Sequence, residues 1–347
     1  MKISNLGRYA LGICAAMAIL TGCGSQTSIG APGALPQMPM NRQPSFYAEA
    51  PATNTNLYVA NDGASTVTVY AQGSTKVLRN ISKGVNAPYA LAFDGSGNLY
   101  VANSSNNTVT VYAPGKTSLL RTISKGVSDP IGLAFDGSGY LYVGNYLNNT
   151  VTVYAPGKTS PLRRISKGVN TPAALAIGGA GYLYVANFGI NRVTEYAPGG
   201  NSVLRTISKG VSEPIALAFD DSGNLYVANI YNNTVTVYAP GKTSPLRTIS
   251  QGVSAPDALA FDGSGNLYVS NDGNSTVTVY APGKTSLLRT IFRGVSNPAA
   301  LAIGSLGYLF VANFRNNTVT EYPPGGTYVV RTISQGVNKP MALAFGP

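Results

Sequence analysis

The residue types that usually carry enzyme chemistry are scarce in this sequence. It contains no His, and its two cysteines are Cys14 and Cys23. Nucleophiles activated by His and zinc centres held by His are excluded, because both need imidazole groups that the chain lacks. The 13 Asp and Glu residues are scattered, without a cluster that has the grouping of metal ligands. We therefore predict no catalytic residue, no metal site and no cofactor.

Cys23 lies directly after a segment that is typical of export signals. Lys2 and Arg8 form a positive start, and residues 11–20 are apolar but too few to span a bilayer. The sequence Leu20-Thr21-Gly22-Cys23 resembles the lipobox of bacterial lipoproteins. The resemblance implies cleavage before Cys23 and attachment of a diacylglyceryl group to its sulfur. An ordinary secretory signal with an incidental Cys23 is the alternative.

This reading divides the chain into three parts. Residues 1–22 are a lipoprotein signal peptide, which also removes Cys14 from the mature chain. Residues 23–53 are the acylated Cys23 and a flexible tether rich in Pro, Gly and Ser, and residues 54–347 are the folded domain. We expect a location in the bacterial cell envelope, at the outer membrane or cell surface, with a lipid anchor in the membrane.

The chain carries a formal net charge of +11, although only 11% of its residues are charged. Such an excess favours contact with anionic lipid, glycan or nucleic acid. For an exported lipoprotein we expect no nucleic-acid partner. We also expect a monomer.

One short motif, Leu-Tyr-Val-Ala-Asn or a close variant, recurs every 42 residues. Residues 54–347 hold seven such units without remainder, which favours a closed ring over an open solenoid. The copies begin at Leu57, Leu99, Leu141, Leu183, Leu225, Leu267 and Leu309.

Each unit contains four short β-rich runs separated by turn residues. In residues 88–129 these runs are 90–93, 98–103, 108–112 and 119–124, with Gly, Pro and Asn between them. A repeat of about 40 residues with four strands is typical of a propeller blade. The prediction is an all-β, seven-bladed β-propeller. We expect residues 342–345 to pair with residues 56–61 and close the ring.

The unit resembles the blades of the NHL and YVTN repeat families across residues 54–347. The matching motifs are Pro-x-x-Leu-Ala-Phe-Asp, Asn-Leu-Tyr-Val-Ala-Asn and Thr-Val-Thr-Val-Tyr. The resemblance implies that the first strand of each unit lines a central channel. The repeat style is also similar to that of streptogramin lyases, whose chemistry uses His, and of gluconolactonase-like propellers, whose divalent metal is held by Glu, Asn and Asp.

Positions that are constant in all units are explained best by the blade itself. An Arg on the outermost strand could dock anionic groups or protect an exposed strand edge. An Asn after the second strand is expected to stabilise its own turn. The turns that begin at Asp94 and Asp262 are expected to be hairpin turns rather than calcium loops. The Arg residues are Arg79, Arg121, Arg163, Arg205, Arg247, Arg289 and Arg331, and the Asn residues are Asn61, Asn103, Asn145, Asn187, Asn229, Asn271 and Asn313.

Two loops in each unit vary instead, one after that Asn and one before the Pro of the first strand. In a four-stranded meander both loops emerge on the same face, so variation is concentrated at one end of the ring. Apolar side chains in these loops suggest a recognition surface. Drift in tolerant loops is the alternative. The candidate ligand-binding residues are Tyr146, Leu147, Phe188, Ile190, Ile230, Tyr231, Phe314 and Arg315.

Two units share a further departure from the common pattern. They carry Glu195 and Glu321 where the other units have Val, and Gly178 and Gly304 where most have Asp. The two glutamates are too far apart in a ring for joint acid–base work. We expect them to pair with Arg192 and Arg315.

The function that fits these features is a non-catalytic, envelope-anchored binding or scaffolding propeller for a protein or glycan partner. The alternative is a hydrolase of the lactonase type, or a lyase, that depends on a divalent metal held by oxygen ligands.

Overall fold

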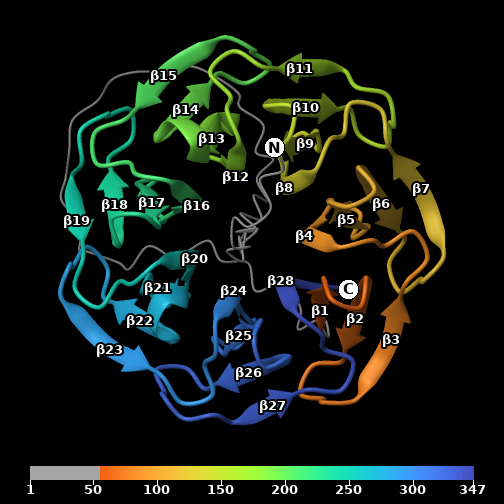
Figure 1. The fold of residues 1–347 in the computed structure, drawn as a ribbon, viewed down its shortest axis with the longest axis vertical. Coiled ribbons are helices and arrows are strands. Elements are labelled where there is room, and N and C mark those ends of the chain that lie inside the picture. Colours follow the sequence, from red (N-terminus) through yellow and green to blue (C-terminus); the bar gives the residue numbers. More distant parts are fainter. Residues whose placement is uncertain (1–54) are drawn as a thin grey trace, which may run out of the picture.

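The computed structural model describes residues 55–347, which form a ring of seven four-stranded antiparallel sheets around a central channel (Figure 1). The predicted seven-bladed propeller is confirmed. The predicted signal peptide, Cys23 and the tether to residue 53 lie outside the described residues. Within residues 55–347, no helix is long and apolar enough to cross a membrane.

Each blade has four strands, ordered from the channel outwards (Figure 1). The innermost strands are β4 (Pro88–Phe93), β8 (Pro130–Phe135), β12 (Pro172–Ile177), β16 (Pro214–Phe219), β20 (Pro256–Phe261), β24 (Pro298–Ile303) and β28 (Pro340–Gly346). The second strands are β1 (Asn56–Asn61), β5 (Leu99–Asn103), β9 (Leu141–Asn145), β13 (Leu183–Asn187), β17 (Leu225–Asn229), β21 (Leu267–Asn271) and β25 (Leu309–Asn313).

The third strands are β2 (Thr66–Tyr70), β6 (Thr108–Tyr112), β10 (Thr150–Tyr154), β14 (Arg192–Tyr196), β18 (Thr234–Tyr238), β22 (Thr276–Tyr280) and β26 (Thr318–Tyr322). The outermost strands are β3 (Val77–Ile81), β7 (Leu119–Ile123), β11 (Arg163–Ile165), β15 (Val203–Ile207), β19 (Arg247–Ile249), β23 (Leu287–Ile291) and β27 (Arg331–Ile333). Three short 3-10 helices, η1 (Gly179–Gly181), η2 (Phe188–Ile190) and η3 (Asp272–Asn274), lie in turns.

The ring closes as predicted. Strand β28 pairs antiparallel with β1, with Leu57 opposite Phe345 and Val59 opposite Leu343. The innermost strand of the last blade is therefore supplied by the C-terminal end of the chain. This pairing leaves no open inner edge between the first and last blades.

Burial along the strands explains their composition. The second strand of each blade lies between two strands of its own sheet and between neighbouring blades, so all five residues of β5 are buried. Side chains also interlock between blades, since the rings of Tyr100 and Phe135 meet edge to face at 4.9 Å. The hydroxyl of Tyr112 donates to the carbonyl of Lys83 in the loop before the blade's own β4 (2.6 Å).

The constant Asn has a structural role, as predicted. Its side chain, however, bonds two strands and the loop before the first strand, and not only its own turn. In the blade of β17, the Nδ2 of Asn229 donates to the carbonyl of Val227 and the hydroxyl of Thr236, and its Oδ1 accepts the backbone N–H of Ser212. The backbone at this position is extended, as at Asn187 (φ −99°). The left-handed residue of the turn comes four positions later, as at Asn233 (φ 56°).

The constant Arg lies on the outermost strand, where it was predicted, but its side chain folds back over the sheet. Arg121 is half-buried and donates to the hydroxyl of Tyr100 (3.0 Å). The same contact joins Arg247 to Tyr226 (3.1 Å). This Arg therefore ties the outer strand to the second strand of its blade.

The two blades that carry Glu195 and Glu321 also place a carboxylate near the Arg of the outermost strand, but this carboxylate comes from a different position in the blade. Where Asp220 ends a first strand, it accepts from the hydroxyl of Tyr226, which in turn accepts from Arg247. Where Gly178 and Gly304 replace that Asp, Glu195 pairs with Arg205 and Glu321 with Arg331. The predicted partners Arg192 and Arg315 are wrong, because the register places Glu195 opposite Arg205 and Glu321 opposite Arg331.

Candidate ligand-binding site at the channel mouth

The two variable loops of each blade lie together on one face of the ring. The backbone N–H of Tyr146 donates to the carbonyl of Asp129 (3.0 Å), and that of Phe188 to the carbonyl of Thr171 (3.1 Å). Equivalent bonds occur in the other blades. The prediction that sequence variation gathers at one end of the ring is therefore confirmed.

The residue before each first-strand Pro has an unusual backbone conformation. Asp129, Glu213 and Lys339 have φ values of 48°, 47° and 48°, in the left-handed region that side chains disfavour. Each donates its N–H to a side chain of the preceding blade, as Asp129 does to Asn107 (2.6 Å). These bonds fix the backbone at the residue before each Pro, so that the type of side chain at this position can vary without a change in backbone conformation.

Each first strand also places one extra residue after its Pro. In β4 the register shifts between Pro88 and Ala90, which leaves Tyr89 as a bulge residue. This position was not among the predicted site residues, although it is the variable one within an otherwise regular Pro-x-x-Leu-Ala motif. Its occupants are Tyr89, Ile131, Ala173, Ile215, Asp257, Ala299 and Met341.

Tyr89 and Asp257 bring polar groups into the channel. Burial raises the pKa of the Tyr89 hydroxyl well above its ordinary value, and the carboxylate of Asp257 raises it further. Strands β4 and β20 belong to blades that are not neighbours, so this interaction acts across the channel (Figure 1). Asp129 and Asp62 act on the Tyr89 pKa in the same direction. Carboxylates from three blades of the ring therefore act on the Tyr89 hydroxyl.

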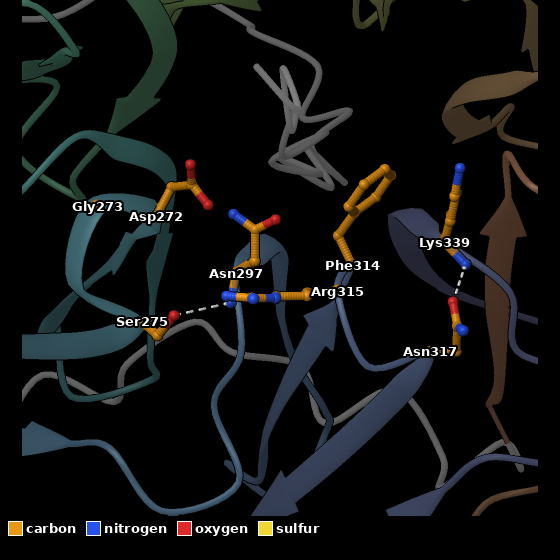
Figure 2. A pocket seen from close by; sticks show the side chains of 8 residues that line it. All are labelled: Asp272, Gly273, Ser275, Asn297, Phe314, Arg315, Asn317 and Lys339. Carbon is orange, nitrogen blue, oxygen red and sulfur yellow. Dashed lines mark hydrogen bonds between the residues drawn. The ribbon is translucent and has the colours of Figure 1, made fainter. Parts of the chain in front are cut away.

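A cavity of about 590 Å³ opens at the channel mouth between the blades of β20, β24 and β28 (Figure 2). Its volume lies in the range of small-molecule sites. Two of the predicted residues, Phe314 and Arg315, line it. The other lining residues are Asp272, Gly273, Ser275, Asn297, Asn317 and Lys339, all of which stand in or beside the variable loops.

The cavity combines two cations, one carboxylate and one aromatic ring. Figure 2 shows the side chains of Asp272, Asn297 and Phe314 around one opening, with Arg315 and Lys339 beside them. The Nζ of Lys339 lies 5.9 Å from the centre of the Phe314 ring. Burial raises the pKa of the Asp272 carboxyl, and its Oδ1 is a buried atom that accepts no hydrogen bond from residues 55–347.

The six remaining predicted residues lie on another arc of the same face, in the loops after β9, β13 and β17. Leu147 and Tyr231 are exposed, at 68% and 74%, and Ile190 is exposed to a lesser degree. Tyr146, Phe188 and Ile230 are half-buried, and the last two pack against a core cluster that includes Ile215 and Leu259. The structure thus divides the predicted set into an exposed apolar rim, a supporting layer and the cavity pair Phe314–Arg315.

Oxygen ligands do not gather into an evident metal site in the described residues. Residues 55–347 contain no group of three or more Asp or Glu side chains placed to hold an ion. In the turn that begins at Asp262, the carboxylate bonds groups of the turn itself. Oδ1 accepts the N–H groups of Ser264 and Asn266, and Oδ2 accepts from the Asn266 amide. The hairpin-turn prediction is confirmed.

Comparison with known proteins supports the fold. No family model and no curated protein matches the chain. A protein of unknown function from Desulfotomaculum acetoxidans aligns with a TM-score of 0.72 at 16% identity, over 84% of this chain and 99% of that one. A Bacteroides fragilis protein described provisionally as a 6-phosphogluconolactonase aligns with a TM-score of 0.71 at 19% identity, over 85% and 99%.

Virginiamycin B lyase from Staphylococcus aureus aligns with a TM-score of 0.63 at 13% identity, over 73% of this chain and 85% of that one. At these identities the likeness concerns the propeller fold and not the activity. The assignment to the NHL and YVTN repeat families stays a prediction.

Proposed function

We propose that this protein is a non-catalytic binding propeller, held in the bacterial envelope by a lipid on Cys23, which recognises a glycan or protein partner. The observation that supports this most strongly is the contrast between the two kinds of position. The side chains of constant residues such as Asn229 and Arg247 form hydrogen bonds within or between blades. The variable residues meet at one channel mouth, where polar and apolar groups face the outside.

The exposed apolar rim gives this proposal a direct test. Leu147, Ile190 and Tyr231 should carry part of the contact, since exposed apolar and aromatic side chains are frequent anchors of binding surfaces. Changing all three to Ser should lower the amount of envelope partner retained by the immobilised protein at least tenfold. Their exposure means that the melting temperature should change little.

A matched control lies on the opposite face, in the turns before β25 and β27. Leu306 and Tyr328 are exposed to similar degrees, 68% and 62%. The variant with both changed to Ser should retain the partner at the wild-type level. Equal losses in both variants would overturn the proposed face, because the loss would then follow from reduced apolar surface alone.

The second candidate function is a hydrolase that depends on a divalent metal. It is favoured by the acidic surroundings of Tyr89 and by the similarity to the Bacteroides fragilis structure. The binding proposal predicts that calorimetry with Ca²⁺ or Mg²⁺ gives no saturable heat at micromolar concentrations. Saturable binding that Asp129→Asn or Asp257→Asn removes would instead support the hydrolase.

A further inference from the structure

The cavity at the channel mouth differs from the rest of the rim in charge. At the first two positions after the constant Asn and at the position before the Pro, Arg315 and Lys339 are the cationic side chains among all seven blades. Both line the same cavity. The other charged residues at these positions, Asp62, Asp129, Glu213 and Asp272, are acidic, and Asp272 lines the cavity as well. The two cations of the variable positions therefore lie in one sector of the ring, together with one carboxylate.

The side chains of both cations are exposed, and that of Lys339 extends from a backbone that is fixed at the rim. Lys339 has a left-handed backbone, and its N–H donates to Asn317 (2.8 Å). The neighbouring Asn297 is fixed in the same way by Ser275 (3.1 Å). The Lys339 ammonium also lies against the Phe314 ring, which restricts its position.

The remaining groups narrow the chemical class of the ligand. Asp272 brings a carboxylate with a buried, unpartnered Oδ1 to the edge of the cavity. The other oxygen of this carboxylate can accept from hydroxyl groups, whereas the negative charge disfavours a doubly charged phosphate beside it. The amides of Asn297 and Asn317 can pair with further hydroxyls. Phe314 supplies one apolar surface for the carbon face of a ring.

We propose that this cavity binds an acidic glycan, with carboxylates of its sugar units on Arg315 and on Lys339 and hydroxyls on Asp272 and Asn297. Arg presents a planar pair of donors that matches a carboxylate. A peptide fits this cavity less well, because its backbone offers fewer donors than a sugar to pair with the polar side chains that line it. The inference rests on the proposed binding function and specifies its ligand.

Calorimetry with the full-length chain and tri-galacturonate as the probe tests this directly. We expect saturable binding that weakens as salt is raised. The fully methyl-esterified trimer should bind at least tenfold more weakly, since it lacks the charge but keeps the ring and most hydroxyls. Equal affinity for both trimers, or no binding to either, would overturn the proposal.

Variants locate the binding to this cavity. Arg315→Gln and Lys339→Gln should each lower the affinity for tri-galacturonate about tenfold or more, because each removes a charge-assisted hydrogen bond. Lys209→Gln, an exposed cation on the same face but in another sector, should leave the affinity unchanged. Asp272→Asn should also weaken binding, although it adds positive net charge, which separates specific pairing from simple attraction.

Two outcomes distinguish this inference from the binding function on which it rests. If an acetylated tripeptide with a free C-terminal carboxylate binds more tightly than the sugar acid, and Arg315→Gln removes that binding, the ligand class is wrong. If neither probe binds while the Leu147, Ile190 and Tyr231 variant still loses its envelope partner, the acidic-sugar site fails and the binding function stands. Retention of the partner by that variant would contradict the function itself.

Discussion

Deletion of residues 340–347 is expected to abolish the folded ring. Strand β28 is the innermost strand of the closing blade, and it pairs with β1 along its length. It also buries Met341 and Leu343, and each such side chain contributes about 1.5–3 kcal/mol. With the lost strand pairing, the total approaches the 5–15 kcal/mol that typically separates folded from unfolded domains. The edge of β1 would be exposed as well.

Circular dichroism and size-exclusion chromatography would measure this effect. The truncated chain should lack the cooperative melting transition of the full chain, or should aggregate. Deletion of Pro347 alone is the matched control, since it removes the carbonyl that accepts from the Tyr58 hydroxyl but leaves β28 in place. That variant should lose only about 1 kcal/mol. A monomeric truncated chain that melts like the full chain would contradict closure through β28.

Replacing Asn229 with Ala should have the next largest effect on stability. The side chain is fully buried and joins three parts of one blade, the loop before β16, the strand β17 and the strand β18. Its removal leaves the Ser212 N–H and the Val227 carbonyl without this partner. Each unsatisfied buried group costs about 1–3 kcal/mol, so we expect a loss of about 2–4 kcal/mol.

Urea unfolding followed by fluorescence or circular dichroism gives this number. Asn232→Ala in the same loop is the control, because Asn232 is exposed and its Oδ1 only accepts from the Thr234 hydroxyl. Its effect should stay within about 0.5 kcal/mol. Equal effects of the two substitutions would mean that the constant Asn does not hold the blade together.

The fold could be predicted from the sequence because the strand alternation, the turn residues and the repeat period all indicate the same four-stranded blade. The run at residues 108–112 alternates strictly, the turn at Asp94 has the residues of a hairpin, and the 42-residue period repeats both. Antiparallel strands joined by short turns leave little freedom in how a unit folds. The ring closure followed from the same period, because the missing first strand of one blade is found at residues 342–345.

The partners of Glu195 and Glu321 could not be obtained from the same pattern. Arg192 and Arg315 are close to them in sequence, whereas Arg205 and Arg331 lie opposite them on the next strand. Only the register, which includes a shift near Tyr196, shows which side chains face each other. Asp220 follows a first strand, whereas Glu195 lies on a third strand. The replacement of one carboxylate by the other therefore links two positions that are far apart in the sequence of the unit.

The candidate site was predicted in part, for a similar reason. The variable loops could be assigned to one face, and Phe314 and Arg315 were recognised within them. Tyr89 and Asp257 were missed, because their proximity depends on how the ring curves across the channel. Phe188 and Ile230 were treated as surface residues, although they support the rim by packing on the core.

The central claim is that the variable channel mouth recognises a partner. A photo-crosslinking amino acid placed at Tyr231, on the apolar rim, tests it most directly in the native envelope. The same amino acid at Tyr328, exposed to a similar degree on the opposite face, is the reference. The claim predicts one discrete crosslinked product from position 231 and none from position 328. Products of equal amount from both positions, or a product from position 328 alone, would contradict it.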